Sequence, residues 1–163
     1  MCSSDLRAYP QKVDLFWLAQ RRPAPLQCRK PMDMDPTDLP ATLHTDPAPI
    51  PDSAFVAAGA RVIGDVRLGS QCSIWYNAVV RGDINYVEIG ARSNIQDSCI
   101  IHVTNAQPCV VGEDVTTGHG ANLHACTVEE GCLIGIGAIV LSGAHIGRGS
   151  IVGAGAEIGR AHV

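Results

Sequence analysis

The sequence has few aromatic side chains, no excess of basic charge and no long apolar run. Phe, Trp and Tyr make up 4% of the 163 residues, too few for the aromatic-rich core of an ordinary globular domain. The net charge of −4 excludes the basic surface that binds nucleic acid or anionic membranes. No apolar stretch approaches the roughly 18–20 residues of a membrane span, and no secretory signal opens the chain. We therefore expect neither a nucleic acid nor a membrane as a partner.

Glycine and proline divide the chain near residue 50. Every glycine lies between Gly59 and Gly159, whereas nine of the ten prolines lie at or before Pro51. Prolines at this density interrupt helices and central strands, so residues 1–49 are expected to be irregular. The glycine-rich residues 50–156 are expected to form the folded domain.

The two ends of the chain are related at the level of DNA. Residues 1–6 can be written as codons whose reverse complement encodes Ile-Gly-Arg-Ala-His in frame, which is the sequence of residues 158–162. Such an inverted pair resembles a sequencing-library adapter, and scars of this kind are excluded from fold reasoning. We expect residues 1–6 and 157–163 to be artefacts, with an authentic start at Met32 or Met34.

A six-residue repeat runs through residues 50–156. Aliphatic side chains recur at every sixth position, with shifts of register after Val80, Ile101 and Leu123, and a small side chain often follows four residues later. A period of six fits neither a helix nor an isolated hairpin, and it predicts a solenoid of short strands and corners. The narrow core of such a solenoid has no room for rings, which explains the scarcity of aromatics. The repeated inward positions are Ile50, Val56, Val62, Leu68, Ile74, Val80, Ile89, Ile95, Ile101, Val111, Thr117, Leu123, Val128, Ile134, Val140, Ile146 and Val152.

The seven cysteines lack the paired C-x-x-C spacing of metal and redox motifs. Cys72, Cys99 and Cys132 fall on small positions of the repeat, so we expect them to be reduced core residues. Cys126 follows His124 by two residues and is expected to pack near it rather than bind a metal. Unpaired cysteines fit a reducing cytoplasm.

Three of the six histidines lie on neighbouring repeats. Stacked coils would place Ile101 beside Leu123 at the strand spacing of about 4.7–4.9 Å. His102 and His124 follow these two residues, so both would point outward and could reach one metal ion. His119 falls near the corner of the preceding face, from which a neighbouring subunit of a cyclic trimer could supply it. Three imidazoles leave a fourth position for water, as in catalytic zinc sites; the alternative is three outward polar residues without a shared role.

Five motifs precede or contain these histidines. They are residues 75–83 (WYNAVVRGD), 89–97 (IGARSNIQD), 101–103 (IHV), 118–120 (GHG) and 123–126 (LHAC). Together they resemble the gamma-class carbonic anhydrase family. The resemblance implies an all-β, left-handed parallel β-helix, whose usual C-terminal helix is missing from this sequence. It also implies a homotrimer with zinc sites at the subunit interfaces. His102 and His124 would come from one subunit and His119 from its neighbour.

The resemblance further implies the reversible hydration of carbon dioxide to bicarbonate. Zinc would lower the pKa of a bound water toward about 7, so that zinc hydroxide attacks carbon dioxide; Fe²⁺ or Co²⁺ would also suit these ligands. Gln96 would hydrogen-bond the hydroxide or bicarbonate, and Asn94 would assist it. Arg81 and Asp83 would form a pair beside the site, either to contact the anionic product or as a purely structural ion pair. Asp97 would orient neighbouring groups.

Besides the missing C-terminal helix, a second feature departs from the family pattern. Residues 84–86 and a loop predicted at residues 104–110 carry no acid to move protons away from the site, so rapid turnover is not expected. The alternatives are a hexapeptide-repeat acyltransferase, in which one histidine acts as a base, and a zinc-binding scaffold or assembly subunit with little activity. His44 and His145 are expected to have neither a partner nor a role.

Overall fold

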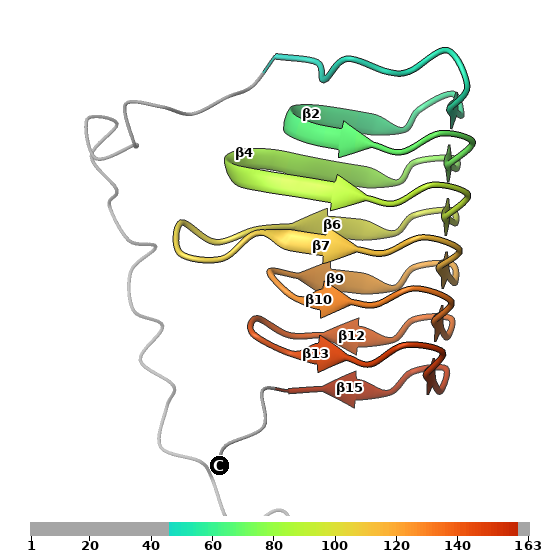
Figure 1. Cartoon of the computed structure of the whole chain (residues 1–163), viewed down its shortest axis with the longest axis vertical. Coiled ribbons are helices and arrows are strands. Elements are labelled where there is room, and N and C mark those ends of the chain that lie inside the picture. The colour runs from blue at the N-terminus through green and yellow to red at the C-terminus, as the bar shows by residue number, and fades with distance from the viewer. Residues whose placement is uncertain (1–45, 160–163) are drawn as a thin grey trace, which may run out of the picture. The chain divides into compact units, whose positions relative to one another are not determined.

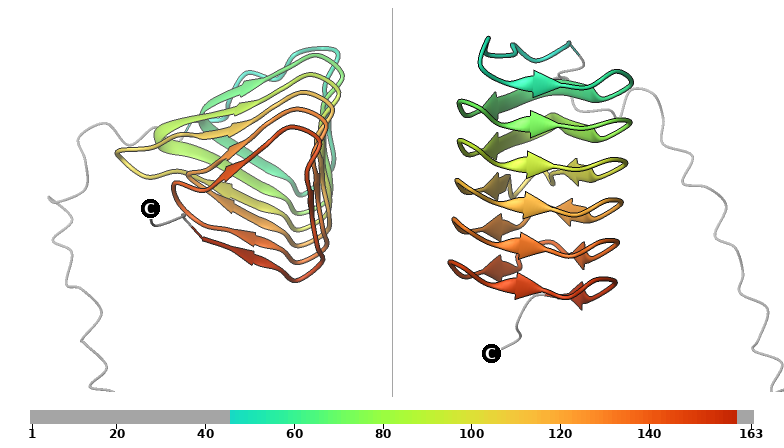
Figure 2. Two further views of the ribbon diagram at one scale, coloured as in Figure 1. Left: turned by 60° about the horizontal axis from the view of Figure 1, so that its bottom comes forward. Right: turned by 90° about the vertical axis from the view of Figure 1, so that its right-hand side faces the viewer.

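The computed structural model describes residues 46–159, which wind into a β-solenoid of stacked triangular coils (Figures 1 and 2). Most strands contain two or three residues and end at a corner. β2 (Arg61–Leu68) and β4 (Val79–Ile89) are longer because they continue around one corner (Figure 1). The others are β1 (Phe55–Val56), β3 (Ser73–Ile74), β5 (Asn94–Ile95), β6 (Ile100–His102), β7 (Cys109–Val111), β8 (Thr116–Thr117), β9 (Asn122–His124), β10 (Thr127–Val128), β11 (Leu133–Ile134), β12 (Ile139–Val140), β13 (His145–Ile146), β14 (Ile151–Val152) and β15 (Glu157–Ile158).

The strands pair in parallel with their counterparts in adjacent coils. One sheet has the order β1-β3-β5-β8-β11-β14 and forms one side of the triangle. The other strands form a nine-stranded sheet over the two remaining sides, because β4 pairs with β6 through its first half and with β7 through its last. The predicted stacking of Ile101 on Leu123 is confirmed by the register of β6 and β9. The solenoid of short strands predicted from the six-residue period is thus confirmed, as is the all-β parallel form that the family resemblance implied.

The repeated aliphatic positions fill the interior of the coils, except Ile50, which was predicted to point inward but is 41% exposed before the first strand. Ile74, Ile95 and Ile134 are fully buried, and burial of such a side chain contributes about 1.5–3 kcal/mol. Thr117 takes an aliphatic position of the repeat, and its Oγ1 is buried without a hydrogen-bond partner in the described residues. Ser93 is fully buried too, but its hydroxyl donates to the carbonyl of Gly112 and accepts the N–H of Val115, so within residues 46–159 the unpaired hydroxyl of Thr117 is the polar flaw of the core.

The cysteines lie in this core as predicted. Cys72, Cys99 and Cys132 are buried free thiols. Cys126 is buried as well, and its Sγ lies 3.9 Å from Sγ of Cys109 in the adjacent coil. Cys126 thus packs inside the solenoid, beneath the outer surface on which His124 lies.

Close stacking of the coils explains two of the glycines that follow aliphatic positions. A Cβ built on Gly90 would lie 2.4 Å from the carbonyl carbon of Gly112 in the next coil. A Cβ on Gly112 would in turn lie 2.7 Å from the backbone nitrogen of Glu130. Any side chain at either position would force adjacent coils apart.

Two predicted boundaries differ from the structure. The loop after His102 ends at Pro108, not at residue 110, because Cys109–Val111 forms β7 between β4 and β10. The solenoid also continues past residue 156, since β15 pairs with β12. The adapter origin of residues 157–163 stays a prediction, and residues 1–45 and 160–163 lie outside the described residues. No helix in residues 46–159 has the length and apolarity to cross a membrane.

Candidate metal centre

The predicted site residues form two groups on adjacent parts of the triangle. The strand group lies on β4, β6 and β9 of the nine-stranded sheet and comprises Arg81, Asp83, His102 and His124. The corner group lies on or directly after β5 and β8, where the chain turns toward β6 and β9, and comprises Asn94, Gln96, Asp97 and His119.

Parallel register brings the two histidines of the strand group together. Arg81, His102 and His124 occupy equivalent positions on β4, β6 and β9. Each follows a buried core residue, so its side chain points outward. The ring centroids of His102 and His124 lie 5.4 Å apart, with 48° between the ring planes. The predicted pair of neighbouring outward imidazoles is therefore present in a single chain.

Asp83 holds the strand group from one end. Its side chain is only 7% exposed, and Oδ2 accepts a hydrogen bond from the Arg81 guanidinium. His102 Nε2 donates to Oδ1 at 3.0 Å. Burial raises the pKa of Asp83, but the hydrogen bonds from His102 and Arg81 outweigh this effect and hold the pKa below its usual value. Asp83 is thus a carboxylate that fixes two neighbouring side chains.

His124 is oriented by a residue that the sequence analysis missed. Its Nδ1 lies 2.7 Å from Oγ of Ser142, which sits in a corner of the next coil. Burial lowers the pKa of His124, and the charges of His102 and Arg81 lower it further. The imidazole is therefore neutral at pH 7, the form that binds metal ions. The sequence signal is that the corner after Leu123 is one residue shorter than the six-residue repeat, whereas the corner that holds Ser142 has the ordinary length.

The corner group surrounds a small pocket. His119 Nδ1 lies 2.8 Å from Oδ2 of Asp97, and Oδ1 of Asp97 accepts the backbone N–H of Tyr76 at 3.1 Å. These contacts suit Asp97 to orient His119. A pocket of about 210 Å³ is lined by Trp75, Asn94, Gln96, Asp97 and His119. No role was predicted for Trp75, because the six-residue repeat indicates which residues face outward and not which of them line a pocket.

The three histidines do not converge within one chain. His119 lies at the corner before β9, whereas His124 ends that strand. Among residues 46–159, no three His, Cys, Asp or Glu side chains lie close enough to hold one metal ion. The chemistry of the donor set nevertheless fits zinc. Each imidazole has one nitrogen held by an oxygen of a neighbouring coil, from Asp83, Asp97 or Ser142, as is usual for metal-binding histidines.

Exposed apolar side chains flank both groups. They form what we call the apolar rim, which comprises Tyr76, Ile100, Ile136, Ile139 and Leu141. Ile100 and Ile139 lie on β6 and β12, and Leu141 directly follows β12. Tyr76 and Ile136 lie at corners on the side of His119. An apolar surface of this kind around polar groups is typical of an interaction site.

The two acid-free segments lie against each other. The side-chain amide of Asn85 donates to the carbonyl oxygens of Thr104 and Asn105 at 3.1 and 3.2 Å. Amide hydrogen bonds therefore join residues 84–86 to the loop at residues 103–108. Neither segment brings a carboxylate toward the histidines.

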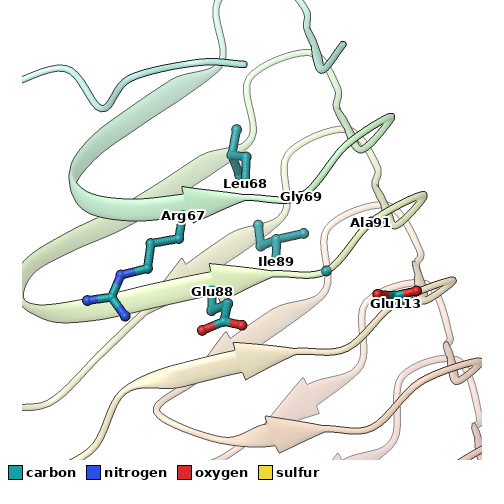
Figure 3. Close-up of a pocket in the computed structure, with 8 residues that line it drawn as sticks. Arg67, Leu68, Gly69, Glu88, Ile89, Ala91 and Glu113 are labelled. Carbon is teal, nitrogen blue, oxygen red and sulfur yellow. The ribbon is translucent and has the colours of Figure 1, made fainter. Parts of the chain in front are cut away.

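Another hollow, of about 360 Å³, lies along β2, β4 and the corners that follow them (Figure 3). Two of its three charged lining residues already have partners: Arg67 pairs with Asp65, and Glu113 pairs with Arg92. Only Glu88 remains. This hollow therefore presents no convergent set of polar groups for a substrate.

His145 has a partner, contrary to the prediction. Its Nε2 lies 2.9 Å from Oε1 of Glu129 on the surface of the last coils. The prediction was wrong because β10 and β13 pair side by side, which brings the residue after β10 next to the first residue of β13. The pair is exposed and belongs to neither group of the site.

Comparisons with known proteins agree with the repeat. A family model described as bacterial transferase hexapeptide (six repeats) matches residues 125–160. Gamma carbonic anhydrase 1, mitochondrial, of Arabidopsis thaliana is 50% identical over 105 residues, which cover 60% of this chain and 38% of that protein. The probable carbonic anhydrase of Methanocaldococcus jannaschii is 46% identical over 85 residues, which cover 52% of this chain and 54% of that protein.

A solved structure extends the comparison to the fold. A hexapeptide transferase family protein from Anaplasma phagocytophilum matches with a TM-score of 0.51 and 38% identity, over 68% of this chain and 72% of that one. The chain spans about half or less of the length of the curated relatives named above. It shares with its hexapeptide-repeat neighbours the left-handed parallel β-helix that the family resemblance implied. With this fold and this repeat, the chain belongs to the hexapeptide-repeat family, and the curated relatives to which it is similar are named as carbonic anhydrases.

Proposed function

We propose that this chain catalyses the reversible hydration of carbon dioxide to bicarbonate at a metal ion held between subunits. The observation that carries the proposal is the stacked pair of His102 and His124 beside the buried Asp83. His119, on a corner of the same solenoid, would supply the third ligand. The names of the curated relatives support this activity.

Zinc is the ion that the donor set favours. Imidazole nitrogens suit Zn²⁺, and Fe²⁺ or Co²⁺ could use the same three ligands. An ion bound by three neutral imidazoles supplies a Lewis acid that lowers the pKa of a coordinated water toward about 7. The task of the protein is to keep the imidazoles neutral and oriented. Partial burial of His124 favours its neutral form. The contacts of Asp83, Asp97 and Ser142 would orient the three imidazoles.

The amides of the corner group would bind the reacting molecule. Gln96 and Asn94 line the same pocket as His119, and Asn94 Nδ2 donates to Ser73 Oγ at 2.7 Å, which fixes that amide. The Gln96 amide can donate a hydrogen bond to an oxygen of bicarbonate through its NH₂ group and accept one at its carbonyl oxygen. Trp75 gives the pocket an apolar wall, which suits an uncharged molecule such as carbon dioxide.

Arg81 would contact the anionic product. Its side chain is 43% exposed, and its pairing with Asp83 uses only part of the five N–H donors of a guanidinium. A purely structural ion pair is the alternative role. Asp83 and Asp97 are both engaged with histidines, and residues 84–86 and 103–108 bring no carboxylate. Proton transfer to solvent is therefore expected to limit the rate.

A homotrimer would complete the site. The side chain of His119 is 53% exposed, whereas that of His102 is 18% exposed. Cyclic symmetry presents the same corner of one subunit to the same side of the next at every interface. Subunit contact would also bury the apolar rim, which contributes about 25 cal/mol per Å² of apolar surface.

We also propose a reducing compartment such as the cytoplasm. The described cysteines are buried free thiols, and Cys109 and Cys126 remain unlinked although their sulfurs are 3.9 Å apart. Proteins that keep such thiols reduced are typical of reducing compartments.

Metal analysis combined with stopped-flow measurement of carbon dioxide hydration tests the proposed function. We expect about one zinc ion per subunit, and we expect His119→Ala to reduce hydration to the uncatalysed rate. His145→Ala, which removes a surface histidine outside both groups, is the matched control and should retain zinc and activity. Zinc without hydration would instead favour a metal-binding scaffold. Binding of acetyl-CoA without zinc would favour an acyltransferase.

A further inference from the structure

We propose that Ser142 is a positioning residue for His124. Its hydroxyl oxygen would accept the Nδ1–H of His124 and so keep Nε2 unprotonated, as a lone pair available to a metal ion. The contact is short, at 2.7 Å between Nδ1 and Oγ. The consequence for metal binding rests on the proposed function, whereas the orientation of the imidazole does not.

The backbone explains why Ser142 can reach His124. Val128 is the fifth residue after the core position Leu123, whereas Ile146 is the sixth residue after Val140 in the next coil. The longer corner therefore has one more residue than the corner against which it stacks. The two coils remain in step, because the N–H of Gly143 donates to the carbonyl of Ala125 at 2.8 Å.

The other two histidines show what such a contact does. His102 is held by Asp83 and His119 by Asp97, both from the preceding coil. A carboxylate can only accept, so the proton lies on the imidazole nitrogen that faces it. A serine hydroxyl can accept or donate, and the tautomer of His124 decides which. A hydroxyl that accepts at Nδ1 makes His124 a ready ligand through Nε2, whereas a hydroxyl that donates leaves the proton on Nε2.

Ser142 acts through His124 and would not itself touch the substrate. Outer contacts of metal-binding histidines fix the tautomer and the ring orientation, and their loss typically lowers metal affinity by about 10–100-fold. Ser142 is half-buried in a turn, so its replacement by alanine removes one hydroxyl and leaves the core intact. The corner should therefore keep its fold in the variant.

Two measurements on the full chain test the inference. In the metal-free wild type above pH 7, nitrogen NMR of the imidazoles should show His124 protonated at Nδ1, and Ser142→Ala should shift it toward the Nε2–H tautomer. In competition with a chromophoric chelator, Ser142→Ala should bind Zn²⁺ about 10–100-fold more weakly. Ser142→Thr retains the hydroxyl and should restore both properties. Ser150→Ala, the same change in another corner, should behave as the wild type.

The inference is overturned if metal-free wild-type His124 carries its proton on Nε2, or if Ser142→Ala binds Zn²⁺ as tightly as Ser150→Ala. If the chain binds Zn²⁺ as expected but does not hydrate carbon dioxide, the proposed function fails and the role of Ser142 stands. If the chain binds no Zn²⁺, the NMR measurement of the His124 tautomer is the remaining test. An unchanged tautomer in Ser142→Ala then overturns the inference.

Discussion

The strand group and the corner group place their histidines in different ways. On the strands, register between adjacent coils fixes His102 beside His124, and the buried Asp83 holds one end of the row. At the corner, His119 depends on a turn and on Asp97, and its side chain is mostly exposed. One chain therefore assembles two of the three imidazoles and displays the third.

This difference indicates how the fold would build a site on its outside. A solenoid core is too thin to enclose a substrate, so under the proposed function the site would form on the outer surface, between copies of the chain. The strand group would act as the fixed half of that cavity, and the corner group as the half delivered by a neighbour. Substitutions at the contact between subunits, at the two carboxylates and in the core should therefore affect the strand group and the corner group to different extents.

Disruption of the apolar rim should have the largest effect. Leu141→Glu places a charge beside the strand group, where a neighbouring subunit would pack, and burial of an unpaired charge is strongly unfavourable. We expect the trimer to dissociate to monomers and zinc to be lost, as measured by analytical ultracentrifugation and metal analysis. Ile151→Glu is the control, because Ile151 is 76% exposed on the other sheet. A trimer that survives Leu141→Glu would contradict the proposed interface.

Loss of the carboxylates should affect the two halves unequally. Asp83→Asn removes a buried anion that holds both His102 and Arg81, so zinc affinity should fall by about 10–100-fold. Asp97→Asn acts on an exposed pair, where water can replace the contact, and the loss should be less than about 10-fold. Chelator competition measures both. A larger loss from Asp97→Asn would reverse the assignment of fixed and delivered halves.

A change in the core beneath the corner should have the smallest effect on the site. Thr117→Val replaces the buried hydroxyl that has no partner, and it should raise the free energy of unfolding by about 1–3 kcal/mol. Thr116→Val, on the outer side of the same strand, should change it by less than about 0.5 kcal/mol. Urea unfolding at one protein concentration checks both values. Weaker zinc binding in Thr117→Val would show that the core and the corner are coupled.

The strand group could be predicted because the repeat encodes it directly. Ile101 and Leu123 are inward positions of the same series, so the residues after them must lie side by side on the outer surface. The end of the loop that follows His102 could not be predicted in the same way. Cys109 is a small inward residue that starts β7, but the series of large aliphatic positions resumes only at Val111.

The contacts that orient the histidines depend on the lengths and turns of individual corners, which the average six-residue repeat does not describe. Ser142 reaches His124 because one corner is a residue longer than its neighbour. Trp75 lines the corner pocket because of the turn that follows it. The role of His119 would depend on contacts between subunits, which neither the sequence nor the single chain contains.

Mixed trimers test the central claim, that His119 of one subunit completes the site of another. His102→Ala and His119→Ala chains should each be inactive alone. Refolded together in equal amounts, they should regain about one quarter of the wild-type sites, because random assembly pairs an intact corner with an intact strand group at one interface in four. Recovery of about a quarter of the zinc and of the hydration rate is the predicted result. No recovery at any mixing ratio would contradict the account.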